Sequence, residues 1–256
     1  MTQCVRGALR SAYRSVAVTL VAVGATALFG GSRPLAAQVA TAPAAVKDQA
    51  ELPHPFFTHM GLPEGVGNFN LRVLGIVTRA DGKTDGDFAF HLETGLTRTI
   101  GLHIRNDRFL NNEKTEAMFQ FAAYVSKDGM SGFAPIIEFE FPTHSGVSRI
   151  STLVGFTTSL GTSRWAFNQV VHYNPREDMV DASAAFVFAA GPSVFPVVEL
   201  LGEGGTGRPT VVNVLAGVKV RVRDWLIAGI AISIPLTTAR DYSSSFAFGL
   251  DREWKP

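Results

Sequence analysis

Side chains that could ligate a metal or act in catalysis are few in this sequence, and their spacing matches no common metal or catalytic motif. Of its six histidines, only His54 and His59 are close together, in a stretch without the helical periodicity that would align them. Metal sites commonly take their ligands from short, regular spacings. The sequence therefore predicts no metal ligand and no cofactor. Cys4 is the single cysteine, which leaves no disulfide.

One adjacent pair, His144 and Ser145, raises the alternative of a membrane-embedded lipid hydrolase. Neighbouring side chains on a strand point to opposite faces, so the two would not meet there. The surrounding residues 142–146 are typical of a turn. No Gly-x-Ser-x-Gly motif occurs, and the glycine-rich residues 202–209 lack the Gly-Lys-Ser/Thr ending of a phosphate-binding loop. We predict no enzyme and no catalytic residue, and keep the hydrolase as an alternative.

Ionisable side chains follow a different pattern, because they alternate with apolar residues at every second position. Within residues 212–222 the even positions are Val or Ala, whereas Lys219 and Arg221 occupy odd positions and Arg223 follows. A strand places all such charges on one face, whereas a helix would scatter them. The same alternation elsewhere predicts one inward-facing set: His91, Glu93, His103, Arg105, Glu138, Glu140, Glu199, Lys219, Arg221 and Arg223.

Two roles are open for this inward-facing set. Acids and bases on different segments can pair across an interior and brace a narrow barrel with a closed lumen. They can equally line a pore, where charge determines which solutes pass. A twelve-stranded barrel is intermediate in width between filled eight-stranded and open sixteen-stranded barrels, so strand count does not separate the two roles.

Strands must position these side chains, and the sequence beyond Gly67 consists of alternating segments of roughly ten residues. Turn sequences such as Asp81-Gly82-Lys83 and Asp128-Gly129 separate them. We predict about twelve strands, near residues 67–79, 86–97, 98–109, 115–127, 132–142, 147–160, 164–174, 179–190, 194–202, 210–223, 225–235 and 242–254.

The residues before these segments divide into two parts. Three arginines precede an uncharged stretch, residues 16–29, which is shorter than the ~20 residues of a membrane helix. This arrangement is typical of a cleavable export signal rather than a retained membrane anchor. We predict a signal peptide over residues 1–37, a flexible lead-in over 38–65 and a barrel over 66–256.

The composition favours a membrane. With 46% hydrophobic residues, 18% charged residues and a mean hydropathy of +0.17, the chain is more apolar than a typical soluble domain. Placing Arg221 or Arg223 in lipid would cost about 2–4 kcal/mol each at the midplane, so the apolar faces should point outward. We predict an all-β fold, a transmembrane antiparallel up-and-down β-barrel of about 12 strands. A soluble periplasmic β-protein is the alternative.

Aromatic residues lie near the ends of several segments and resemble the girdles of a membrane barrel: Phe109, Tyr124, Trp165, Tyr173, Phe195, Trp225, Tyr242 and Trp254. In the last segment, Phe246, Phe248 and Leu250 share one parity with Tyr242 and Trp254. This row resembles the C-terminal signal that the outer-membrane assembly machinery reads. It departs from that signal because Arg252 interrupts the row and Lys255-Pro256 follow it.

Over residues 67–254 the chain resembles the outer-membrane transporters of the phenol meta-degradation pathway. The resemblance lies in the overall plan: an export signal and a short lead-in come before about twelve short-looped strands. The last strand contains Phe246-Ala247-Phe248-Gly249-Leu250. The resemblance implies passive or facilitated diffusion of small solutes, including hydrophobic or aromatic ones. No functional residue is carried over, because no family motif is matched.

We expect membrane lipid, the outer-membrane assembly machinery and a small-molecule solute as partners. The net charge of +1 gives no reason to expect nucleic acid. The expected location is the cell outer membrane of a Gram-negative bacterium.

Overall fold

The computed structural model describes residues 52–110, 114–142 and 150–255. The predicted signal peptide, the first part of the predicted lead-in and the pair His144 and Ser145 lie outside these residues. The described part of the chain contains no helix long and apolar enough to cross a membrane.

Strands account for most of the described residues beyond position 68. They are β1 Phe69–Ala80, β2 Lys83–Gly95, β3 Ile100–Asn106, β4 Lys114–Phe121, β5 Tyr124–Val125, β6 Gly132–Pro142, β7 Ser151–Thr162, β8 Trp165–Asn174, β9 Met179–Phe188, β10 Val194–Gly205, β11 Val211–Arg223, β12 Leu226–Pro235 and β13 Ser244–Trp254. The short β5 pairs with β6, as β4 does, and so continues β4 after a break of two residues.

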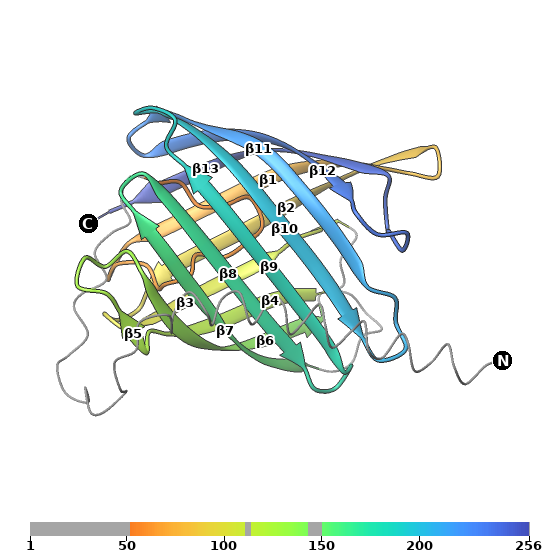
Figure 1. Ribbon diagram of the computed structural model, residues 1–256, viewed down its shortest axis with the longest axis horizontal. Helices are drawn as coiled ribbons and strands as arrows, with labels where there is room; N and C mark the ends of the chain where they lie inside the picture. The colour runs from red at the N-terminus through yellow and green to blue at the C-terminus, as the bar shows by residue number, and fades with distance from the viewer. Residues whose placement is uncertain (1–51, 111–113, 143–149, 256) are drawn as a thin grey trace, which may run out of the picture. The chain divides into compact units, whose positions relative to one another are not determined.

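The sheet closes on itself (Figure 1). With β4 and β5 counted as one strand, every strand pairs antiparallel with its neighbours in the chain, and β1 also pairs with β13, with Phe69 opposite Trp254. Closure satisfies the backbone groups that an open edge would expose. The prediction of a twelve-stranded antiparallel up-and-down barrel is confirmed, with β4 and β5 counted as one interrupted strand.

Local turn chemistry supports this topology at the β1–β2 hairpin. Asp81 and Gly82 connect the two strands and both have positive φ angles, 49° and 76°. Two consecutive positive φ angles are the signature of the type I′ turn, whose twist matches that of the flanking strands. The Asp-Gly sequence predicted as a turn therefore fixes the register of the first hairpin, in which Ala80 lies opposite Lys83.

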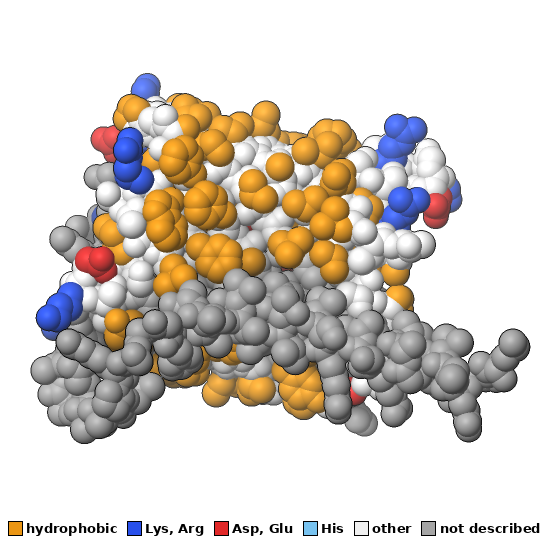
Figure 2. Space-filling model, viewed as in Figure 1, with side chains coloured by type: hydrophobic (Ala, Val, Ile, Leu, Met, Phe, Trp, Pro, Cys, Tyr) orange, Lys and Arg blue, Asp and Glu red, His pale blue; other side chains and the backbone are white. Residues whose placement is uncertain are grey.

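The two faces of the barrel wall differ in the predicted way. On β13, Phe246, Phe248 and Leu250 are exposed, whereas Ala247 and Asp251 on the opposite parity are buried. In Figure 2, hydrophobic side chains cover the middle of the described surface, and charged side chains lie toward its two ends. An apolar band between polar ends is typical of a transmembrane barrel.

One aromatic residue departs from the predicted girdles. Phe195 is 2% exposed and packs inside the barrel, with the Arg221 guanidinium 5.2 Å from its ring centroid. It shares parity with Glu199 on β10, which also faces inward. Position near a strand end therefore did not identify its face, whereas parity does. Phe109, Tyr124, Trp225 and Trp254 are exposed.

Candidate functional site

The interior of the barrel holds residues 52–65, which we call the inner segment (orange in Figure 1). Phe56, Thr58, His59 and Leu62 are each at most 3% exposed. The sequence predicts a flexible lead-in here, whereas the structure places these residues against inward-facing side chains of the wall. The reason is that the segment carries its own apolar residues, and the wall supplies hydrogen-bond partners for its backbone.

Glu199 on β10 is the main partner of that backbone. Its carboxylate accepts hydrogen bonds from three consecutive backbone N–H groups, those of Phe56, Phe57 and Thr58, and from the Thr58 hydroxyl. The Thr58 N–H lies 2.8 Å from Oε2. A buried carboxylate must be compensated in this way, because the charge has left water. Glu199 is therefore an anchor for the inner segment.

Phe56 fills an apolar part of the lumen. It packs in a buried cluster with wall residues that include Leu74, Val197 and Leu215. A Cβ atom added at Gly229 would lie 2.9 Å from the Phe56 ring, and one added at Gly217 would lie 2.8 Å from it. The two glycines thus leave the volume that the ring occupies, so this part of the wall is complementary in shape to the inner segment.

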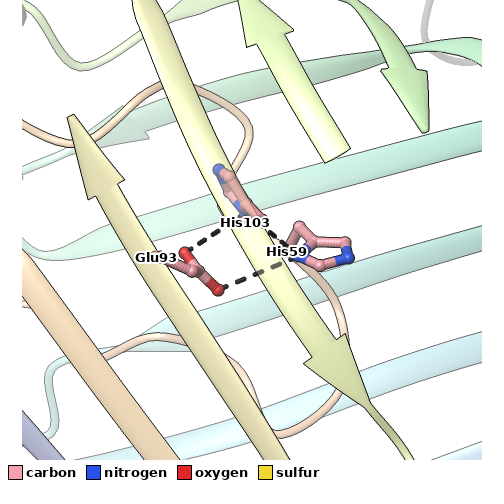
Figure 3. A group of neighbouring side chains, drawn as sticks. All are labelled: His59, Glu93 and His103. Atoms are coloured by element: carbon pink, nitrogen blue, oxygen red, sulfur yellow. Dashed lines mark hydrogen bonds and ion pairs between the residues drawn. The ribbon is translucent and has the colours of Figure 1, made fainter. Parts of the chain in front are cut away.

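His59 meets a polar part of the wall (Figure 3). Its Nδ1 atom lies 3.1 Å from Nδ1 of His103 on β3, and 3.9 Å from Oε1 of Glu93 on β2. Oε2 of Glu93 lies 3.7 Å from Nδ1 of His103. All three residues are at most 1% exposed. The inner segment and two adjacent strands thus bring two imidazoles and a carboxylate together.

Gln120 on β4 orients one of these imidazoles. Its amide nitrogen donates to the Met60 carbonyl at 3.0 Å and to the Thr157 hydroxyl at 2.7 Å, so its carbonyl oxygen points to His103 Nε2 at 3.2 Å. An oxygen at this position accepts only from a protonated Nε2. In the neutral ring, the Nδ1 atom of His103 therefore presents a lone pair toward His59 and Glu93.

Buried ion pairs surround this group. The Arg72 guanidinium lies 3.1 Å from Glu93 and donates to the Phe56 carbonyl at 2.9 Å. Lys219 pairs with Asp251 at 2.5 Å and donates to the Pro55 carbonyl at 3.1 Å. Each cation therefore links a wall carboxylate to the backbone of the inner segment. Such bridges satisfy both the buried charges and the carbonyl groups.

A second ionic cluster lies on β3, β4 and β6. Arg105 pairs with Glu116, and Lys114 pairs with Glu140. Glu138 is 1% exposed, 3.3 Å from His172 Nδ1 and 4.0 Å from Arg105. Neither oxygen of Glu138 accepts a hydrogen bond from the described residues. This cluster leaves a buried carboxylate that its basic neighbours only partly compensate.

Electrostatics differ between the two histidines of the inner segment. Burial alone would lower the pKa of His54, but Glu93 and Glu64 raise it to about 10. His54 lies 2.9 Å from Glu64 and 3.0 Å from Glu93, so it is an imidazolium at neutral pH. Burial and the nearby Arg105 hold the pKa of His59 well below its usual range. The segment therefore carries one charged and one neutral imidazole.

The structure brings together most of the predicted inward-facing set. Buried in the interior are His91, Glu93, His103, Glu138, Glu140, Glu199 and Lys219. Arg105 and Arg221 are half-buried. Arg223 is exposed at the end of β11, where an irregularity in the pairing with β12 separates it from Arg221. The alternation that placed Arg223 with the others stops at this irregularity, and Arg223 does not join the cluster.

Sequence reasoning missed several members of the site. Arg72 is the one charged residue on the inward parity of β1, and Asp251 follows Ser245, Ala247 and Gly249 on that of β13, so no charged stripe marked either residue. Gln120 is uncharged, and His59 belongs to a stretch without periodicity. The apolar content of the inner segment could have indicated that it is buried. Removing the side chains of Leu52, Phe56, Met60 and Leu62 from water is favourable.

Comparisons with known proteins agree with this fold. No family model and no curated protein matches the sequence. Among solved structures, the chain is similar to an outer-membrane channel from Pseudomonas putida F1, with 11% identity, 76% of this chain and 98% of that chain covered, and a TM-score of 0.56. The KdgM porin is similar at 6% identity, 73% and 99% coverage and a TM-score of 0.56. The NanC porin is similar at 9% identity, 73% and 100% coverage and a TM-score of 0.52. The chain therefore has the fold of outer-membrane β-barrel channels.

Proposed function

We propose that this protein is a channel in the outer membrane of a Gram-negative bacterium, and that it passes small solutes through a lumen narrowed by the inner segment. The apolar outer band suits a lipid environment. The row of Phe246, Phe248 and Leu250 on the outside of β13 suits recognition by the outer-membrane assembly machinery. The likeness to channels of known structure supports the barrel on which the proposal rests.

The observation that carries the proposal is the ionic interior. Buried carboxylates outnumber buried cations in the described part of the chain: Glu93, Glu116, Glu138, Glu140, Glu199 and Asp251 against Arg72, Lys219 and the imidazolium of His54. A barrel that served only as a filled structural element would be more stable with apolar residues at many of these positions. Charges that line a pore instead bias which solutes pass, and the acidic excess here favours cations over anions.

A second candidate function is a structural barrel with a closed lumen. It is favoured by the apolar cluster around Phe56, which fills one side of the interior. A hollow remains beside the inner segment, lined by residues that include His54, Glu64, Asn70 and Glu253. The two functions differ in whether ions pass when the inner segment is in place. Only the channel function passes solutes, and these include the hydrophobic or aromatic solutes that the family resemblance implies.

Planar-bilayer recording of the refolded protein tests the proposal. We expect small, cation-selective channel events from the native chain, and larger events from a variant whose residues 52–65 are replaced by a Gly/Ser sequence of equal length. Heat-modifiable migration on gels checks that both are folded. A silent native barrel beside a conducting variant would favour the closed structural barrel, and silence of both folded proteins would overturn the channel proposal.

The acidic excess gives a sharper form of this test. Replacing Glu138 by Gln, with recordings at pH 9 where the buried carboxyl group is ionised in the native protein, removes a charge that accepts no hydrogen bond from the described residues. We expect the reversal potential in a salt gradient to move toward zero, because the pore loses a negative charge. The matched control is Glu177→Gln, since Glu177 lies in the connection between β8 and β9 and is exposed. Equal reversal potentials for the native protein and Glu138→Gln would contradict this role.

A further inference from the structure

The group formed by His59, Glu93 and His103 has the composition of a metal site. One ligand atom of each residue lies within 4.8 Å of the other two. The two Nδ1 atoms are 3.1 Å apart, Glu93 Oε2 lies 3.7 Å from His103 Nδ1, and Glu93 Oε1 lies 3.9 Å from His59 Nδ1. Ligands about 2.0–2.2 Å from a tetrahedral Zn²⁺ are roughly 3.3–3.5 Å apart from each other. The imidazole nitrogens therefore need to move by only a few tenths of an ångström, and the Glu93 carboxylate must rotate to present one oxygen to both.

The donor set identifies the class of ion. Two imidazole nitrogens and one carboxylate oxygen are ligands that suit Zn²⁺ and other divalent transition metals. Ca²⁺ and Mg²⁺ prefer sites built from oxygen atoms, so two imidazoles disfavour them. Three protein ligands also leave one tetrahedral position open to water or a solute.

The surroundings of the group support metal binding independently. Gln120 is held by two donated hydrogen bonds, and its oxygen accepts from His103 Nε2. A ligating histidine typically donates its second ring nitrogen to such an oxygen, which fixes the tautomer and the orientation of the ring. Glu93 Oε2 lies 3.7 Å from Nδ1 of His103 and 3.0 Å from Nδ1 of the His54 imidazolium, so a metal ion would compete with His54 for this oxygen. The other oxygen of Glu93, Oε1, is the one that pairs with Arg72.

We infer that His59, Glu93 and His103 bind a divalent transition-metal ion, with Zn²⁺ as the best fit, and that the ion links the inner segment to β2 and β3. His59 belongs to the inner segment, whereas Glu93 and His103 belong to the wall (Figure 3). A ligand that binds only the assembled form stabilises that form by mass action. Bound metal therefore holds the inner segment in the lumen. This last consequence rests on the proposed channel function, whereas metal binding itself does not.

Calorimetric titration of the purified full chain, refolded in detergent and carrying no histidine tag, tests the binding. We expect one Zn²⁺ per chain and no detectable heat from Mg²⁺. His59→Gln and His103→Gln should each weaken Zn²⁺ binding by more than roughly 100-fold, because each removes a ligand. Gln120→Leu should weaken it by roughly 10- to 100-fold, the usual effect of losing the group that orients a ligating histidine.

The control is His172→Gln. His172 is a buried imidazole whose ring stacks 6.4 Å from that of His59, but it does not belong to the group. This variant should bind Zn²⁺ as the native chain does. Heat-modifiable migration confirms that each variant is folded. Folded His59→Gln and His103→Gln that bind Zn²⁺ as tightly as the native chain would overturn the inference, as would an equal loss in His172→Gln.

A spectroscopic readout separates ligation from a general effect on stability. Co²⁺ bound by two imidazoles and a carboxylate in a site of low coordination gives strong visible absorption, which Co²⁺ in water lacks. We expect this absorption from the native chain and from His172→Gln, and not from His59→Gln. Absence of the absorption from the native chain would contradict the proposed ligand set.

Conductance then tests the consequence for the inner segment. Zn²⁺ should reduce channel events of the native protein, and a chelator should restore them, whereas His59→Gln should not respond. If the native protein binds Zn²⁺ in solution but never conducts, the channel proposal fails and the metal site stands. If it conducts but binds no Zn²⁺, the metal site fails and the channel proposal stands.

Discussion

Two neighbouring parts of the inner segment meet opposite kinds of wall, and we call them its apolar end, at Phe56, and its polar end, from His59 to Gly61. Phe56 packs against an apolar wall with glycines that leave room for its ring. His59, three residues later, meets imidazoles, carboxylates and an amide. Apolar packing depends on volume and shape, whereas buried charges depend on having every partner in place. The comparison teaches that one short segment is held by two mechanisms, which should respond differently to substitution.

The largest expected effect is the loss of the Phe56 side chain. Phe56→Ala should lower the free energy of unfolding by about 3–5 kcal/mol, because the ring is fully buried and the wall cannot collapse into its space. Urea unfolding in detergent, followed by tryptophan fluorescence, measures this loss. Phe57→Ala is the control, since Phe57 is only partly buried, and its loss should be less than half as large. Equal losses would show that the wall does not select the Phe56 ring.

Glu199 binds the backbone between the apolar and polar ends, and its substitution tests the ionic mechanism. Glu199→Gln keeps the shape of the side chain but removes the charge that three backbone N–H groups share. We expect a loss of about 1.5–3 kcal/mol, the range for hydrogen bonds to a charged group. Glu203→Gln, an exposed position on the same strand, should leave the free energy of unfolding unchanged. A Glu199→Gln protein as stable as the native one would remove Glu199 from the role of anchor.

Shape complementarity at the apolar end predicts a coupling between two residues. Gly229→Ala should cost about 1–2 kcal/mol, because the new methyl group lies 2.9 Å from both the Phe56 ring and Lys219 Cγ. In a Phe56→Ala background the same substitution should cost less, since the ring is gone and only the flexible Lys219 side chain must shift. A double-mutant cycle measures this difference. Additive effects would show that the wall at Gly229 is not shaped to the Phe56 ring.

The sequence predicts the wall well because a strand has a strict period of two. Val214 and Val220 on one parity, against Lys219 on the other, fix both the element and its faces. The prediction went wrong for Phe195, where position near a strand end was used in place of parity. Parity was available there, because Glu199 is four residues further along the same strand.

The interior contacts could not be predicted in the same way. His59 is separated from Glu93 and His103 by a turn, two strands and a change of direction, so no spacing in the sequence joins them. The inner segment has no periodicity, because its extended backbone is shaped by the wall around it. The neighbouring strands β2, β3 and β4 meet the same few residues of the segment only in the folded sheet.

The smallest expected effect concerns a single hydrogen bond at the polar end. The Asn168 side-chain oxygen on β8 accepts from the Gly61 N–H at 3.0 Å, and both residues are buried. Asn168→Ala should lower the free energy of unfolding by about 1 kcal/mol, the usual net worth of one such bond. Asn213→Ala is the matched control, since the Asn213 side-chain oxygen on β11 has no hydrogen-bond partner among the described residues. If both substitutions cost the same, the polar end would be held by its ion pairs alone, and the amide contacts would add nothing to them.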